Sequence, residues 1–193
     1  MQTTDACAGE FRREFLDELH IAEAQLLALG EAVPAENYDW GPAEKTRCFS
    51  AVLVHIAVGN LGLLDRVGVC EPEVMRLYGA IEGEGIARLV AVVRKNLSLE
   101  SSITEKTEVL DLLRGSFEAV RHSFAAATRE QLEEKQNFFG PPSTVRRVYM
   151  RMLAHSHEHM GQAIAYARTM GVRVPWPDPL KEMERIEAGA AAG

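Results

Sequence analysis

The sequence has little of what a disulfide framework or a nucleic-acid-binding surface needs. It contains three cysteines in 193 residues and no CxxC pair, and an odd, widely spaced set argues against a disulfide framework. The formal net charge is −7, whereas a duplex-binding domain needs a basic surplus to displace counterions. The short cluster of Arg146, Arg147 and Arg151 is too small to change this, and we interpret it as a solvated helix face. We therefore expect no nucleic acid among the partners.

Long apolar runs and targeting signals are also lacking. No run approaches the roughly 20 apolar residues that span a bilayer, so we expect no membrane association. Residues 1–10 have neither the basic nor the apolar region of a signal peptide, and a reducing cytoplasm is the expected compartment. The chain is 47% hydrophobic and 25% charged, which is typical of a globular protein. We predict a single domain over residues 1–193, with a flexible tail after about residue 187.

What the sequence does contain is helical periodicity almost throughout. Gly30 is expected to end the first helix and Gly171 the last long one, because glycine readily adopts the left-handed conformation after a helix. Ser143 or Thr144 can cap the start of that last helix. A short helix is expected at about 180–186. Four long helices are predicted, at about 9–29, 50–67, 106–127 and 144–170.

The stretch 71–105 is predicted as a long connection with one or two short helices. Pro72 interrupts it near its start, and 86–96 could form one short helix. A long connection can return the chain to the end from which it came, so the second and third long helices could run parallel. The predicted fold class is all-α, a four-helix bundle with a long connection between helices 2 and 3.

Histidines on the last long helix form the chemical centre of the sequence. His155 and His159 are four residues apart and project from one face, whereas His157 lies about 200° away from His155. The face that carries His155 and His159 is otherwise apolar and points inward. Burying two imidazoles there costs free energy unless each finds a partner, and a metal ion would supply that partner. The alternative is a pair of ordinary hydrogen-bonded histidines.

A third metal ligand would have to come from another helix, and His55 is the best candidate. It lies in the middle of the apolar second helix, where a lone histidine is more often a core residue; the inward pair on the last helix favours ligation instead. His20 and His122 fall off the apolar stripes of their helices and are interpreted as surface residues. His157 is interpreted as a surface residue or an outer partner of the site.

Three neutral histidines suit Zn²⁺, Ni²⁺ or Fe²⁺. Three protein ligands leave a position open for water or substrate, which is typical of catalytic rather than structural zinc sites. Outer acceptors should orient the imidazoles, and Glu158 or Gln162 could serve. Cys48 could share a helix face with His55, but a small buried residue is the better interpretation.

Three segments resemble the DinB-like (DinB/YfiT) superfamily. The first is HxxxHMGQ at residues 155–162, which is similar to the signature of that family's last helix. The second is YDWGP at 38–42, followed by Phe49, His55, Ile56 and Ala57, which resembles the entry to its second helix. The third is the tail over 166–176. Together they cover most of the chain except 71–105. This segment is longer here than in the shorter members of the superfamily.

The resemblance implies a bundle of four helices with an unusual chain order, often dimeric, and a three-histidine metal site. His55, His155 and His159 match the ligand positions. Members with known activity include thiol-dependent S-transferases and a mycothiol-dependent maleylpyruvate isomerase, so a small-molecule substrate, a thiol among the candidates, and a homodimer are expected. The family name comes from induction by DNA damage, which does not imply DNA binding.

Three functions stay open at this point. The first is a metal-dependent transferase acting on a low-molecular-weight thiol, with Trp40, Phe138 and Phe139 as candidate pocket walls or, equally, as core closure. The second is a metal-dependent hydrolase, because residues 155–159 also satisfy H-x-x-E-H with Glu158 as base. The third is a non-enzymatic metal-binding or stress-response protein whose ion holds the bundle together.

Overall fold

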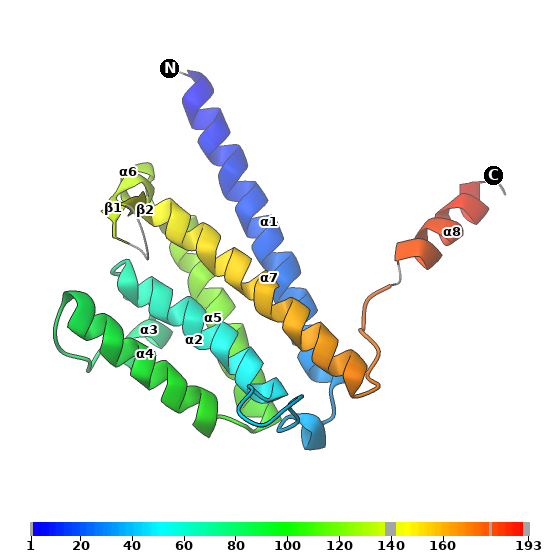
Figure 1. Ribbon diagram of the computed structural model, residues 1–193. Coiled ribbons are helices and arrows are strands. Elements are labelled where there is room, and N and C mark those ends of the chain that lie inside the picture. Colours follow the sequence, from blue (N-terminus) through cyan, green and yellow to red (C-terminus); the bar gives the residue numbers. More distant parts are fainter. Residues whose placement is uncertain (1, 138–141, 178, 191–193) are drawn as a thin grey trace.

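The computed structural model describes residues 2–137, 142–177 and 179–190, and most of these residues are helical (Figure 1). The predicted all-helical class is confirmed. The long helices are α1 (Gln2–Ala32), α2 (Phe49–Arg66), α4 (Gly85–Ser102), α5 (Lys106–Ala126) and α7 (Val145–Thr169). The shorter ones are η1 (Ala35–Asn37), α3 (Pro72–Tyr78), α6 (Arg129–Glu133) and α8 (Pro179–Ala190). Strands β1 (Lys135–Gln136) and β2 (Ser143–Thr144) form a short antiparallel pair that the sequence analysis did not predict.

Helices α1, α2, α5 and α7 pack around one core, in which α1 and α2 each contact both α5 and α7. Lys106 at the start of α5 donates to the carbonyl of Val33 just after α1 (2.9 Å), and Arg12 of α1 donates to the carbonyl of Ala127 just after α5 (2.6 Å). These two helices are therefore antiparallel. Helix α2 begins at the same end as α5, so α2 and α5 run parallel, as the long connection allows (Figure 1).

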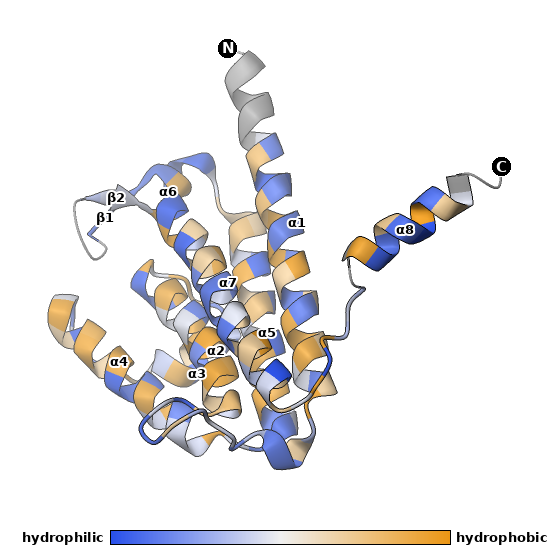
Figure 2. Cartoon of the chain, turned by 45° about the vertical axis from the view of Figure 1, so that its right-hand side comes forward, coloured by the Kyte–Doolittle hydropathy of each residue, from blue (hydrophilic) through white to orange (hydrophobic). Residues whose placement is uncertain are grey.

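Helix α2 is the centre of the core, and it contacts α4, α5 and α7. Its residues are mostly hydrophobic, whereas hydrophobic and hydrophilic residues alternate along α8 (Figure 2). By length and composition alone, Phe49–Arg66 could cross a membrane, but 67% of this segment is buried inside the protein. Such burial is typical of a core helix.

The first helix passes the residue that was expected to end it. Gly30 lies within α1, which continues to Ala32. A Cβ atom at this position would lie 2.6 Å from Cδ2 of Leu110, and the Tyr38 hydroxyl donates to the Gly30 carbonyl (2.9 Å). Gly30 therefore lies in a close contact with Leu110 inside the helix and does not end it. At the end of α7, the prediction for Gly171 is confirmed: it adopts a φ of 77° directly after that helix.

The connection between α2 and α5 contains more helix than predicted. The segment expected to hold a short helix at 86–96 forms α4, which extends to Ser102. The polar residues near its end have low helix propensity, but Ser101 satisfies its hydroxyl on the Leu97 carbonyl (2.8 Å) and Glu100 is buried against α2. Tertiary packing thus outweighs propensity here. Helix α8 continues to Ala190, beyond the predicted start of a flexible tail, and residues 191–193 lie outside the described part.

Candidate metal centre

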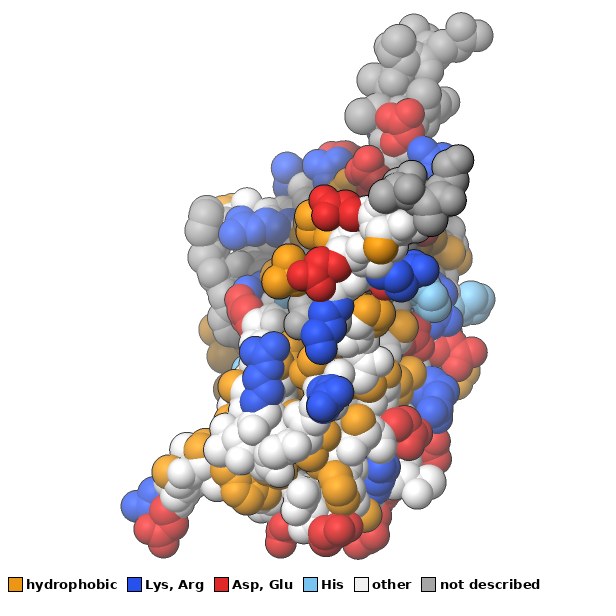
Figure 3. All heavy atoms as spheres, turned by 90° about the vertical axis from the view of Figure 1, so that its right-hand side faces the viewer, with side chains coloured by type: hydrophobic (Ala, Val, Ile, Leu, Met, Phe, Trp, Pro, Cys, Tyr) orange, Lys and Arg blue, Asp and Glu red, His pale blue; other side chains and the backbone are white. Residues whose placement is uncertain are grey.

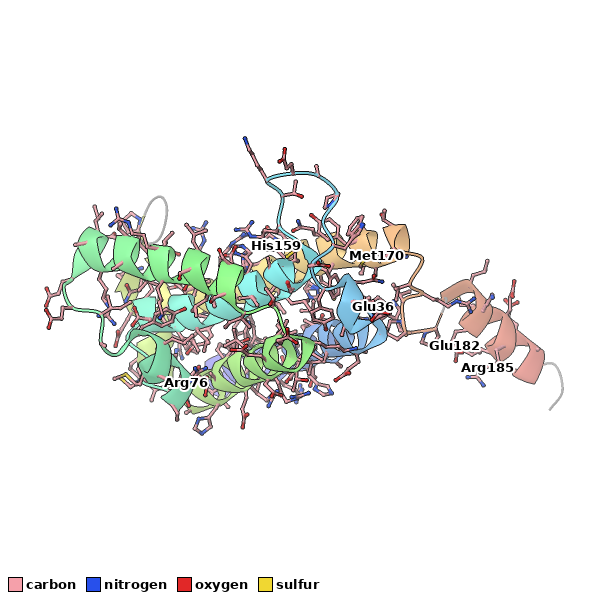
Figure 4. The ribbon with its side chains drawn as sticks, turned by 90° about the horizontal axis from the view of Figure 1, so that it is seen from below. Glu36, Arg76, His159, Met170, Glu182 and Arg185 are labelled. Atoms are coloured by element: carbon pink, nitrogen blue, oxygen red, sulfur yellow. The ribbon has the colours of Figure 1, made fainter. Side chains whose placement is uncertain are left out.

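Three histidines from two helices meet between α2 and α7. His55 lies on α2, and His155 and His159 lie one turn apart on α7. One potential ligand atom from each lies within 4.8 Å of the other two. The i, i+4 spacing on α7 and the contact of α7 with α2 bring the rings together, and Figure 4 shows His159 on the part of α7 that runs beside α2. The structure thus assembles all three of the residues that the sequence singled out.

The nitrogen atoms of these rings are arranged for a shared partner. Nε2 of His55 and Nε2 of His155 lie 3.1 Å apart and face each other. The His55 and His159 rings meet edge to face, with centroids 4.5 Å apart. Neutral imidazole nitrogens are good ligands for divalent transition metals. A small cation between the three rings would therefore fit the donor set.

Glu100 orients His55. Its carboxylate accepts from Nδ1 of His55 (2.7 Å) and from Nε of Arg47 (2.7 Å) and is 8% exposed. Burial alone would raise the pKa of Glu100, but the hydrogen bonds and charges of His55 and Arg47 outweigh it and lower that pKa. An ionised carboxylate only accepts, so Nδ1 of His55 carries the proton and Nε2 keeps a free lone pair. This carboxylate–histidine pair is typical of metal sites.

Gln162 orients His159 in the same way. Its amide nitrogen donates to the Tyr166 hydroxyl (2.9 Å), which turns its Oε1 towards Nδ1 of His159 (2.8 Å). His159 therefore donates through Nδ1 and presents Nε2. Of the two outer acceptors considered from the sequence, Gln162 takes this role. Glu158 instead accepts two hydrogen bonds from Arg151 (2.8 and 2.6 Å) on the exposed side of α7, so nothing in its surroundings marks it as the base of an H-x-x-E-H site.

His155 is held neutral. Burial, followed by the neighbouring charges of His55 and His159, lowers the pKa of His155 from 6.5 to about 4. Burial is also the largest cause of the lowered pKa of His159. Nδ1 of His155 is buried and has no hydrogen-bond partner within the described residues. A neutral ring is the form that binds a metal ion.

Gly59 makes room for the His155 ring. A Cβ atom at this position would lie 2.7 Å from Cε1 and 3.1 Å from Nδ1 of His155. No real Cβ contact is as short as the first of these distances, so a larger side chain would displace the ring. Because Gly59 is four residues after His55, it lies on the same face of α2. Helix α2 thus carries one candidate ligand, His55, and one turn later leaves space for the ring of another, His155.

The remaining candidate residues lie outside the cluster. His20 and His122 are exposed, as predicted, and His122 contacts Glu71 (2.8 Å). His157 is half-buried and is not part of the three-histidine group. Cys48 precedes the first residue of α2, and its sulfur lies 3.2 Å from the Ser50 hydroxyl. It is half-buried rather than buried, and it too is not one of the three clustered ligands.

A cavity of about 500 Å³ adjoins the histidines, and His55, Gly59 and His155 form part of its wall. Trp40, a predicted wall residue, does not line it: it packs edge to face on Tyr166 (5.4 Å) and against the core. The core-closure interpretation of Trp40 therefore holds. Phe138 and Phe139 lie outside the described residues.

Sequence reasoning missed Glu100 and Gly59. Glu100 lies in the segment that was read as a connection, and no local pattern links it to His55, 45 residues earlier in the chain. Gly59 carried a signal, since a glycine inside an apolar helix costs about 1 kcal/mol relative to alanine and is usually kept for close packing. Its spacing of four from His55 could have placed it at the site.

Replacing Glu100 with glutamine is expected to weaken metal binding about 10- to 100-fold, the usual effect of losing an outer carboxylate. The amide is neutral and no longer strengthens His55 as a donor. Competition with a chromogenic chelator measures the affinity. Glu158→Gln is the matched control, because Glu158 adjoins a candidate ligand in sequence yet contacts Arg151. Equal affinities for the two variants would contradict the role of Glu100.

Acidification is expected to destabilise the metal-free protein between about pH 6.5 and pH 4. Because the pKa of His155 falls to about 4 on folding, the unfolded chain binds more protons in this range and the free energy of unfolding decreases as the pH falls. We expect a loss of about 2 kcal/mol, less than the full shift implies because the ring is partly exposed. Urea titrations across this range measure it. His155→Gln should reduce the dependence of the free energy of unfolding on pH, and His20→Gln should not. The reverse result would contradict the attribution of this dependence to His155.

Comparison with known proteins agrees with this architecture. A crystal structure of a DinB-like protein from Bacillus cereus ATCC 10987 superimposes with a TM-score of 0.58 at 19% sequence identity, covering 85% of this chain and 95% of that one. At this identity the likeness shows the fold alone. No curated protein matches the sequence. The family model of the DinB superfamily matches residues 18–163, which is most of the chain and includes all three histidines. The protein therefore belongs to the DinB superfamily.

Proposed function

We propose that α1, α2, α5 and α7 form a four-helix bundle of the DinB type that holds one divalent metal ion, and that the protein is a metal-dependent transferase acting on a low-molecular-weight thiol. The observation that carries this proposal is the meeting of His55, His155 and His159, two of which, His55 and His155, line a cavity. Zn²⁺, Ni²⁺ and Fe²⁺ are the candidate ions, because each accepts imidazole ligands.

Two features favour chemistry over a purely structural ion. The described residues offer three ligands in this cluster, whereas structural zinc sites are normally closed by four. The cavity also reaches two of the three histidines, which gives a small molecule access to the ion. A bound divalent ion lowers the pKa of a coordinated thiol or water and so supplies a nucleophile near neutral pH.

The chain's own residues would prepare the site for this chemistry. Glu100 and Gln162 each fix the proton of one imidazole on Nδ1, which leaves Nε2 unprotonated towards the ion. Leu63, Leu89 and Val92 give the cavity an apolar wall, so a substrate there would be partly shielded from water. Shielding strengthens the interaction between a thiolate and the cationic site.

The direct test is transfer of a thiol to an electrophile. Metal-loaded protein would be incubated with monochlorobimane and a panel of low-molecular-weight thiols, and adduct formation followed by fluorescence. We expect turnover with at least one thiol, and its loss in His55→Ala, with His20→Ala as the unaffected control. Full activity in His55→Ala would refute the proposal. Turnover of ester or peptide substrates instead would indicate a hydrolase, and metal binding without any turnover a structural or stress-response role.

The other expectations about cellular context stay predictions. A cytoplasmic location, a homodimer, and the absence of nucleic-acid and membrane partners are all consistent with the DinB family, and so is a single domain. For the dimer, the surface to examine is the exposed apolar face of α4, where Ile86 is 80% and Leu97 52% exposed. Light scattering after gel filtration measures the oligomeric state directly.

A further inference from the structure

The cavity beside the three histidines carries a concentration of positive charge. Its wall includes Arg66 from α2 and Arg147 and Arg151 from α7, and none of its described lining residues is Asp or Glu. The chain as a whole is acidic, with a formal net charge of −7. On the face seen in Figure 3, basic side chains lie among acidic ones. Three arginines without a lining carboxylate are therefore a local exception in this protein.

Arg147 breaks a rule of helix electrostatics. It lies in the first turn of the 25-residue helix α7, which has no acidic residue there, although the positive end of the helix dipole disfavours cations. Its neighbour Arg146 is compensated by Glu133 (3.1 Å). The side chain of Arg147 has no hydrogen bond or ion pair with any residue in the described part of the chain. Locally unfavourable choices of this kind are expected at functional sites.

The other two arginines are held in place and keep spare donors. Arg66 donates to the carbonyl of Asn137 (2.8 Å), and Arg151 uses two N–H groups on Glu158. A guanidinium has five N–H donors, so each retains several. Arg146, Arg147 and Arg151 are all exposed or partly exposed, in agreement with the solvated face expected from the sequence, and Arg147 and Arg151 also line the cavity. Planar guanidinium groups bind carboxylate and phosphate oxygens in bidentate fashion.

Apart from the histidines, Asn96 and Asn137, the rest of the wall is apolar. Leu63 of α2 and Leu89, Val92 and Val93 of α4 line the same cavity, and Val93 is 45% exposed. Contact with these residues favours a hydrophobic ligand body through the removal of apolar surface from water. The cavity therefore combines an apolar wall, an electropositive part and the histidine cluster.

We propose that this cavity binds a small organic anion, with a carboxylate or phosphate group on Arg147 and its neighbours Arg66 and Arg151 and an apolar body against α2 and α4. The identification of this anion as the electrophilic substrate of the thiol transferase rests on the proposed function. The binding itself does not, because none of the three arginines is a candidate metal ligand.

The test measures anion binding to protein stripped of metal with EDTA, so that the anion cannot bind to the ion. Hexanoate, hexyl phosphate and uncharged 1-hexanol are titrated by calorimetry into the wild type, Arg147→Gln and Arg168→Gln. Arg168 is the matched control because it is an exposed arginine at the far end of the same helix. We expect at least one anion to bind at least tenfold more tightly than hexanol, with at least a tenfold loss in Arg147→Gln and no change in Arg168→Gln.

The tighter of the two anions identifies the chemical class of the ligand. Failure of both anions to bind, or equal binding by the wild type and Arg147→Gln, would overturn the proposal. Arg147 is exposed, so its replacement should not unfold the protein, and thermal melting checks this. Anion binding by a protein that never takes up metal would reject the proposed function and keep this inference. Metal-dependent thiol transfer without anion binding would reject this inference and keep the proposed function.

Discussion

Zn²⁺ added to the metal-free protein will raise the free energy of unfolding by about 4 kcal/mol when the free ion is about a thousand times its dissociation constant. The reason is that the three histidines come together only in the folded chain, where His55 is supplied by α2 and the other two by α7. For a chain of this size, each kcal/mol moves the melting temperature by about 2–4 °C. Calorimetry should therefore show an increase of about 10 °C.

His159→Ala should lose this stabilisation. Two remaining imidazoles bind a divalent ion more weakly, and the ion then no longer bridges α2 and α7 as firmly. His20→Ala is the control, because His20 is exposed on α1 and lies outside the cluster. An equal increase in melting temperature for His159→Ala and the wild type would show that zinc binds elsewhere on the chain and would contradict the site.

Gly59→Ala is expected to weaken metal binding at least tenfold, although the substitution replaces none of the three histidines. The added methyl group would lie 2.7 Å from Cε1 of His155, so the ring must move from the position where its Nε2 faces His55 at 3.1 Å. Metal sites tolerate displacements of only a few tenths of an ångström in ligand distance. Alanine is the better helix former by about 1 kcal/mol, so propensity itself does not favour unfolding.

Gly161→Ala is the matched control for this prediction. Gly161 lies inside α7 close to His159 in sequence, and a Cβ atom there meets nothing within 4 Å. Both variants make the same chemical change inside a helix, and they differ only in what the new methyl group meets. Equal metal affinity in Gly59→Ala and Gly161→Ala, measured by chelator competition, would show that the close approach of Gly59 to His155 has no bearing on the site.

The helices and the three histidines could be predicted because both depend on short-range patterns. Apolar periodicity placed α2, α5 and α7 nearly as observed, and Thr144 indeed caps α7 by accepting from the Arg147 amide (3.3 Å). The i, i+4 spacing then put His155 and His159 on one inward face. His55 followed from its position in an apolar helix.

What could not be predicted depends on tertiary contacts. The length of α4 and the role of Glu100 follow from packing against α2 (Glu100 to His55, 2.7 Å), which no local pattern in 71–105 encodes. Gly30 looked like a helix end because glycine serves both at ends and at close contacts, and only the neighbouring Leu110 distinguishes the two. The cavity beside Arg147 and Arg151 could not be predicted because the sequence does not show what faces α7.

The central claim is that His55, His155 and His159 hold one metal ion. The most direct test is the metal content of untagged protein by plasma mass spectrometry, beside His55→Ala and His159→Ala. The account predicts about one Zn, Ni or Fe per chain in the wild type and its loss in both variants. A wild-type protein that takes up no metal even after incubation with Zn²⁺, Ni²⁺ and Fe²⁺ would contradict it and would leave the three histidines as polar residues of the bundle core.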